Sequence, residues 1–268
     1  MTREGVMDYF IVGIASLIVS VLALYSGFGL GTLLMPIFSL FFPIPVAVAS
    51  TAAVHLSNNI FKIIFVGKNA DWRIVLRFGI PAVALAIPGA FILLEIVNIS
   101  PLFTYNLGDN QFMVTTVNLV VAVLILIFAG FELIPNVRDV QFPKKYIPLG
   151  GALSGFFGGL SGHQGALRSA VLAKAGLDTP VFVGTASVCA MMVDVSRLTV
   201  YGFTFFSNDF SLISQGNSVV LVGVATVFAF LGTFISSRFI DKVTMKTVRL
   251  VVGVLLVGIG IGLGSGIL

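Results

Sequence analysis

Residues 150–168 read GGALSGFFGGLSGHQGALR and lie between long apolar segments. Ser161, His163, Gln164 and Arg168 interrupt the small residues of this stretch. A fainter copy occurs near the start of the chain, where Ser26 is followed by glycine at positions 27, 29 and 31. Apolar segments that glycine breaks at corresponding places of two halves are typical of secondary-transporter binding sites. The two stretches therefore predict both the architecture and a binding site.

The composition excludes an ordinary soluble protein. Of the 268 residues, 57% are hydrophobic and only 10% are charged, and the mean hydropathy is +1.09. A soluble domain carries about 25% charged residues, so the lipid bilayer must be the solvent of this chain. We expect a multi-pass integral protein of the cell membrane. The net charge of +4 then reflects the loops and indicates no nucleic-acid partner.

The apolar segments predict an all-α membrane protein with about 8–10 transmembrane helices. Two segments, residues 32–42 and 163–174, are too short to cross a bilayer of about 30 Å as helices. Each follows a glycine-rich break, so each half is expected to open with a hairpin of short helices. Residues 98–111 and 202–217 are expected to be loops.

The distribution of Lys and Arg predicts the orientation. Residues 67–73, 132–145 and 238–249 hold most of these residues, whereas 98–111 and 202–217 hold none. The first group is expected in the cytoplasm and the second outside. The two halves then have inverted orientations in the membrane, which requires an odd number of crossings in each half. We count five crossings in each, so both termini are expected outside.

The two halves are predicted to be inverted copies, a first transmembrane repeat over residues 1–135 and a second over 136–268. Shifting the numbering by 135 places aligns Ser26 with Ser161, Asn59 with Asp194, and Lys62 with Arg197. An amide or acid followed three residues later by a base is costly inside a membrane. Its occurrence twice in register therefore supports the repeat.

Each half presents a polar stripe on one helix face. Thr51, His55, Asn59 and Lys62 share a face of the segment 46–66. Ser187, Asp194, Arg197 and Tyr201 likewise share a face of the segment 181–201. Such stripes face the protein interior or a water-filled cavity. We predict that Asn59 contacts substrate and that Asp194, Arg197, Lys62 and His55 line the path or carry protons.

Other roles remain open for several of these residues. The Asn59 side chain could form a hydrogen bond between helices, and the Lys62 side chain could extend toward the membrane surface. Asp194 and Arg197 are spaced to pair with each other. His55 could be an interior histidine with satisfied hydrogen bonds.

Arg168 is the strongest candidate for binding an anion. A charged side chain near the middle of a short membrane helix needs either a carboxylate such as Asp194 or an anionic ligand. The planar guanidinium suits oxyanions. Gln164 and His163 stand at the start of the same predicted helix. The free backbone N–H groups and the positive end of the helix dipole at that position favour an anion. The substrate-binding residues predicted beside Arg168 are Gln164, His163, Ser161, Ser26, Gly29 and Asn59.

No cofactor and no metal site are expected. Two histidines and Cys189 on separate segments do not form a zinc-binding set. The chain has no nucleotide-binding loop, so drive by ATP is not expected. No catalytic residue is assigned.

The glycine-rich segments resemble those of the TauE/SafE family of sulfite exporters, also called the toluene-sulfonate uptake permease family. Residues 27–31 followed by Pro36 fit the family pattern loosely, and residues 158–165 form the second copy without the proline. The resemblance covers nearly the whole chain. It implies proton-driven export or uptake of sulfite, sulfonates or related organic anions.

The function predicted from these features is a secondary transporter, an exporter coupled to protons, for a small anion such as sulfite or a sulfonate. Its partners are the anionic substrate and the bilayer, and a homodimer is an open alternative. An anion channel gated by Asp194 and Arg197 is one alternative function. Another is an intramembrane serine hydrolase built on Ser161, with His55 as base because His163 is too near to Ser161 in the sequence.

Overall fold

The computed structural model describes residues 3–26, 30–108, 110–134, 143–172, 175–208, 218–238 and 245–268. These residues form ten α-helices, two short 3-10 turns and one β-hairpin. The helices of the first half are α1 (Arg3–Ser26), α2 (Leu30–Phe38), α3 (Ile44–Val66), α4 (Trp72–Val97) and α5 (Thr116–Leu133). Those of the second half are α7 (Ile147–Ser161), α8 (Gly165–Leu172), α9 (Thr179–Asn208), α11 (Ser218–Arg238) and α12 (Met245–Ser265).

The predicted helical membrane architecture is confirmed, including the two short helices α2 and α8. In the described part of the chain, three helices are long and apolar enough to cross a membrane: Trp72–Val97, Thr179–Phe203 and Val219–Ser236. Large apolar side chains such as Ile64 and Phe203 point outward, with about three quarters of their surface exposed (73% and 74%). Exposed apolar surface of this kind suits contact with lipid.

Two predicted loops were wrong in part. Residues 202–208, expected in a loop, continue α9 as helix. Residues 98–111 are not an irregular loop either. They contribute to a β-hairpin of β1 (Phe103–Leu107) and β2 (Asn110–Val114). Aromatic residues favour strands, and the rings of Tyr105 and Phe112 stack in opposed positions 5.5 Å apart. Gly108 provides the left-handed backbone of the turn, with a φ of +63°.

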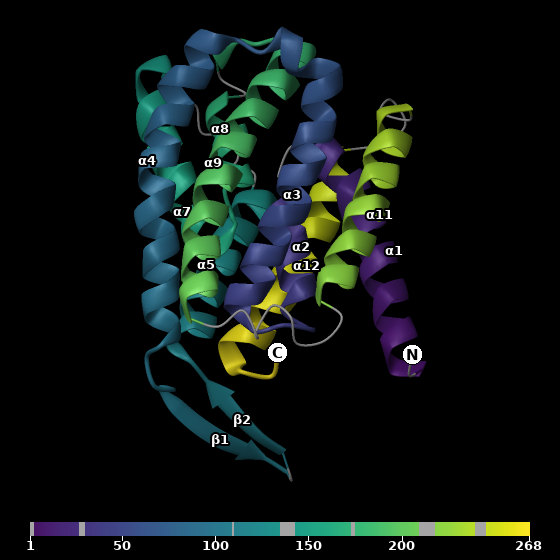
Figure 1. The fold of residues 1–268 in the computed structure, drawn as a ribbon, viewed down its shortest axis with the longest axis vertical. Coiled ribbons are helices and arrows are strands. Elements are labelled where there is room, and N and C mark those ends of the chain that lie inside the picture. Colours follow the sequence, from purple (N-terminus) through teal and green to yellow (C-terminus); the bar gives the residue numbers. More distant parts are fainter. Residues whose placement is uncertain are drawn as a thin grey trace.

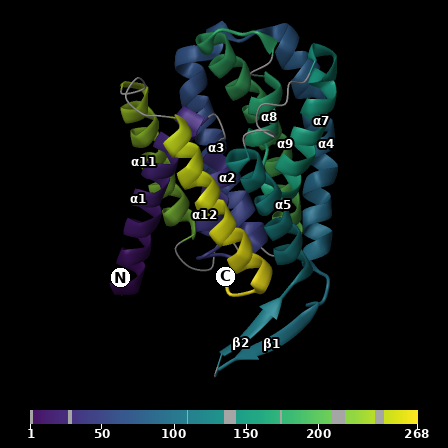
Figure 2. The same cartoon turned by 180° about the vertical axis from the view of Figure 1, so that it is seen from behind.

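Figure 1 shows that both chain ends lie at the same end of the molecule as the hairpin. The connection between α3 and α4, which contains the turn Gly67–Asn69, lies at the opposite end. Figure 2 shows the same arrangement from behind. The loop expected outside and both termini therefore share one side, as the distribution of Lys and Arg predicted.

Glycine allows α4 and α7 to pack closely. Gly151, Gly155 and Gly159 follow one another at intervals of four and face the α4 backbone. A side-chain carbon on Gly155 would overlap the carbonyl oxygen of Ala82. Small residues at this spacing let helix backbones approach each other in membranes, where lipid contributes no hydrophobic drive.

The helices of the two halves are interleaved. The first-half helix α4 packs against α7 and α9, and the first-half helix α1 packs against α11. Polar side chains join α1 and α11, since the Ser20 hydroxyl lies 2.6 Å from the Ala229 carbonyl oxygen and 2.7 Å from Thr233 Oγ1. A separate apolar core lies among α4, α7, α8 and α9 and includes Phe78, Leu172 and Val193. These contacts bring α3, α8 and α9 together around the site.

Candidate functional site

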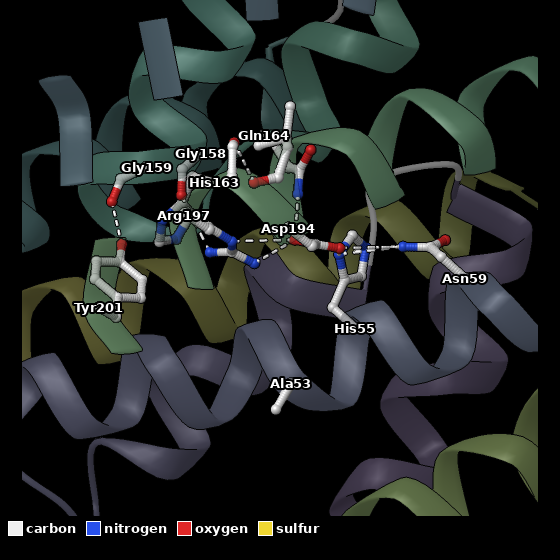
Figure 3. Close-up of polar contacts among 12 residues, drawn as sticks. Ala53, His55, Asn59, Gly158, Gly159, His163, Gln164, Asp194, Arg197 and Tyr201 are labelled. Carbon is white, nitrogen blue, oxygen red and sulfur yellow. Dashed lines mark hydrogen bonds and ion pairs between the residues drawn. The ribbon is translucent and has the colours of Figure 1, made fainter. Parts of the chain in front are cut away.

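Asp194 is the centre of a buried polar network between α3 and α9 (Figure 3). Its side chain has no exposed surface. Oδ1 accepts a hydrogen bond of 2.8 Å from Gln164 Nε2, and bonds of 3.0 Å and 2.7 Å from Arg197 Nε and Nη2. Oδ2 lies 2.6 Å from His55 Nδ1. Both carboxylate oxygens are therefore occupied by donors from three elements.

Arg197 is fully engaged with protein atoms. Two of its nitrogens bind Asp194, and its third, Nη1, donates to the carbonyl oxygen of Gly158 at 3.1 Å. Asp194 and Arg197, three residues apart on one helix face, form an ion pair. This pairing was one of the alternatives that the sequence left open. A buried ion pair is stabilising only when such additional hydrogen bonds complete it.

His55 presents one ring nitrogen to the carboxylate. An ionised carboxylate only accepts hydrogen bonds, so His55 Nδ1 carries the proton that points at Asp194. Asn59 Nδ2 lies 3.3 Å from His55 Nε2 and can donate to it. His55 Nε2 is thus the atom of this ring that can take up a further proton.

Arg168 differs from Arg197 because it has no carboxylate partner among the described residues. Its Nη1 donates to Gln164 Oε1 at 3.0 Å, while its Nε has no partner there and is buried. The Gln164 amide therefore binds Arg168 with its oxygen and Asp194 with its nitrogen. The positive charge of Arg168, which is 5% exposed, is left without an opposite charge in contact with it.

A polar cavity of about 50 Å³ lies beside Arg168. Its polar lining consists of His55, Asn59, Lys62, Arg168, Ser169 and Ser187. One water needs roughly 10–15 Å³ by this measure, so the space holds roughly four waters or an ion of similar size. No carboxylate belongs to the described lining. The arrangement suits an anion that accepts hydrogen bonds.

A larger cavity of about 270 Å³ adjoins the polar one between α3, α9 and α11. Its lining is mostly apolar, with Phe61, Phe65 and Phe234 among its residues. Lys62 and Val183 belong to the walls of both cavities. Lys62 therefore stands where the polar cavity meets the apolar one.

Ser161 and His163 lie at the break between α7 and α8 but outside the lining of the polar cavity. His163 Nδ1 lies 2.9 Å from the Ser161 carbonyl oxygen and 3.1 Å from Ser161 Oγ. The imidazole stacks on Phe128 with ring centres 5.5 Å apart. Gly162, with a φ of +82°, ends α7 in a left-handed conformation that glycine adopts without strain.

The structure thus brings Arg168, Gln164, Asn59, His55 and Asp194 together, with Arg197 behind them and Lys62 at the far wall. Gly29 lies outside the described residues, as does the side chain of Ser26. The start of α2 nevertheless lies close to the α7–α8 break, because a side-chain carbon on Gly31 would lie 3.3 Å from the Gly162 carbonyl oxygen. Tyr201 donates to the Gly159 carbonyl oxygen and so belongs to the framework of the site.

Two serines of the site were missed in the sequence. Ser169 lines the polar cavity directly after Arg168. Ser154 Oγ donates to the Gln164 carbonyl oxygen at 2.8 Å and so fixes the break that carries Gln164. The signal in the sequence that could have indicated Ser154 was its position as a polar residue inside the glycine-rich run. Among the described residues, no cluster of three His, Cys, Asp or Glu side chains could hold a metal ion.

Apolar helices thus surround a cavity whose lining includes the cationic side chains of Arg168 and Lys62. A sequence model described as sulfite exporter TauE/SafE matches residues 12–263. The chain belongs to this family, and its class is that of membrane transporters of sulfur-containing anions. No curated protein and no solved structure matches the chain.

Proposed function

We propose that the protein is a proton-coupled secondary carrier of a small sulfur oxyanion such as sulfite, exporting it across the cell membrane. The observation that carries the proposal is the buried guanidinium of Arg168, which faces the polar cavity without a carboxylate partner. Burying an unpaired charge is costly, so an anionic ligand is the natural counter-charge. Arg168, Asn59 and Ser187 donate to the oxyanion, and Gln164 holds Arg168 in place.

His55 is the proposed site of proton exchange. It lines the cavity and has one nitrogen on Asp194, so a proton on its second nitrogen produces an imidazolium beside an existing carboxylate. That proton moves with the anion and offsets part of its charge during transfer. Arg197 keeps Asp194 ionised in both states, so Asp194 orients His55 and does not itself exchange the proton.

The inverted repeat is part of the proposal. Shifting by 135 residues equates α1 with α7 and α4 with α11, and the packed pairs α1–α11 and α7–α4 then correspond to each other. The short helices α2 and α8 correspond in the same way and are in contact. Symmetry of this kind supports alternating access, in which the site opens to one side at a time.

The test is uptake of radiolabelled sulfite into liposomes that contain the purified protein, with an imposed pH step. Arg168→Gln should weaken substrate binding roughly 10- to 100-fold, the range expected for a hydrogen bond from a charged group. Arg77→Gln is the matched control, because it removes an exposed arginine of α4 outside the cavity. Size-exclusion chromatography verifies that both variants fold.

Each outcome of this assay is decisive. Saturable uptake that depends on the pH step and is lost only in Arg168→Gln supports a carrier with its site at Arg168. Uptake that survives the substitution would assign Arg168 to the framework. Flux without saturation or coupling would favour an anion channel.

The geometry does not favour the hydrolase alternative. His163 Nδ1 must donate to the Ser161 carbonyl oxygen at 2.9 Å, so it cannot accept the hydroxyl proton of the same serine. Ser161 Oγ lies 3.1 Å from the Phe157 carbonyl oxygen and donates its proton there. His55 is bound to Asp194 and is not a partner of Ser161.

A further inference from the structure

Three cationic side chains lie around the site, and the structure distinguishes them by their partners. Arg197 is compensated, because Asp194 accepts from two of its nitrogens and the Gly158 carbonyl oxygen accepts from the third. Arg168 binds only the neutral Gln164 amide among the described residues. Lys62 lines the same cavity as Arg168, and no ion pair to Lys62 occurs in the described part of the chain.

The balance of charge in the cavity follows from these partners. Asp194 and Arg197 cancel each other, and His55 is neutral until it takes up a second proton. Two uncompensated positive charges remain, on Arg168 and on Lys62. Both face a cavity of about 50 Å³ whose described lining contains no carboxylate. Like charges that share so small a space repel each other unless a counter-ion lies between them.

We infer that Lys62 makes the site selective for a doubly charged oxyanion over a singly charged one. The inference rests on the proposed function and specifies the charge of its substrate. A sulfur oxyanion with two negative charges neutralises Arg168 and Lys62 together. A sulfonate of similar size carries one negative charge and leaves one of the two cations uncompensated.

The position of Lys62 supports a role in selectivity. It follows Asn59 by three residues on the same face of α3, so both side chains project toward α8 and α9. Its ammonium group is a point charge without directional hydrogen-bond geometry, whereas the Arg168 guanidinium is a planar fork. Arg168 therefore orients the oxyanion, and Lys62 adds the second charge where the cavity meets its apolar neighbour.

The experiment compares inhibitors of labelled sulfite uptake in proteoliposomes at one fixed pH. Sulfate and thiosulfate each carry two negative charges, and methanesulfonate carries one on a comparable sulfur–oxygen group. The wild-type protein should be inhibited at least about tenfold more strongly by the two dianions than by methanesulfonate. Lys62→Met keeps the length of the side chain without its charge and should abolish that preference. Lys68→Gln removes an exposed lysine nearby and should retain it.

The outcomes separate this inference from the function on which it rests. Sulfite uptake that methanesulfonate inhibits as strongly as the dianions, or that no dianion inhibits, would overturn the inference and leave an anion carrier. Retention of the preference in Lys62→Met would overturn it as well. Absence of transport of any sulfur anion by folded wild-type protein would overturn the proposed function itself.

Discussion

His55 on α3 and Asp194 on α9 lie 139 residues apart in the chain, and their side chains meet at 2.6 Å in the protein interior. This contact links the polar stripe of the first half to that of the second. Because Arg197 and Gln164 bind the other oxygen of the same carboxylate, the charge of Asp194 is shared among the helices α3 and α9 and the α7–α8 break.

Asp194→Asn should lower the free energy of unfolding by about 3–5 kcal/mol, because it leaves Arg197 buried without a counter-charge. Thermal unfolding in detergent measures the effect. Asp178→Asn is the control, since Asp178 is exposed and asparagine can replace it in capping α9. Adding Arg197→Met to Asp194→Asn should recover part of the stability but no transport. If Asp194→Asn and Asp178→Asn were equally stable, the role given to Asp194 would be contradicted.

His55→Gln should separate anion exchange from proton coupling. Exchange of labelled sulfite for unlabelled sulfite at equal pH on both sides should continue, because Arg168 remains. Accumulation driven by a pH step should be lost, because glutamine cannot take up a proton. His163→Gln is the control, since His163 is buried outside the cavity lining and should retain coupling. Coupled accumulation in His55→Gln would exclude His55 as the proton site.

Gly155→Ala should destabilise the packing of α4 and α7, because the added methyl group overlaps the Ala82 carbonyl oxygen. Overpacking of this kind costs about 1–3 kcal/mol. Gly223→Ala in α11 adds the same methyl group where nothing lies within 4 Å and should be neutral or slightly stabilising. Thermal unfolding of the two variants compares them directly. A stability for Gly155→Ala that equals that of Gly223→Ala would show that the helices can separate without penalty.

Ser161→Ala should leave sulfite transport within about twofold of the wild type, because the Ser161 hydroxyl binds only main-chain oxygen and His163. A fluorophosphonate probe should not label the wild-type protein. Labelling that Ser161→Ala abolishes would instead support the hydrolase alternative.

The helices were predictable because hydrophobicity and glycine determine them in a membrane. The predicted segment 46–66 became α3, beginning at Ile44, and the predicted short helix 163–174 became α8, beginning at Gly165. The β-hairpin was not predicted, because five-residue strands outside an apolar segment give little periodic signal.

The site was predictable in its residue types more than in its pairings. The spacing of Asp194 and Arg197 indicated an ion pair, and the depth of Arg168 indicated a binding role. The sequence could not indicate that Gln164 would join Arg168 to Asp194, because that depends on how the α7–α8 break positions a side chain against α9. His163 resembled a ligand in the sequence but stacks on Phe128, a contact that depends on the packing of another helix.

The interleaved packing of the two halves also determines which parts of the molecule can move as rigid bodies. Helices α4, α7, α8 and α9 pack on one another, as do α1, α2, α3 and α11, and the two groups meet mainly where α3 crosses α9. Each group contains helices from both halves, so neither group coincides with residues 1–135 or 136–268. In the proposed carrier, a relative movement of the two groups that opens the α3–α9 contact separates His55 from Asp194. For such a movement, the energy needed to break that one contact contributes to the barrier between the two orientations of the proposed carrier, and an imidazole that changes its charge would alter how fast the molecule turns over.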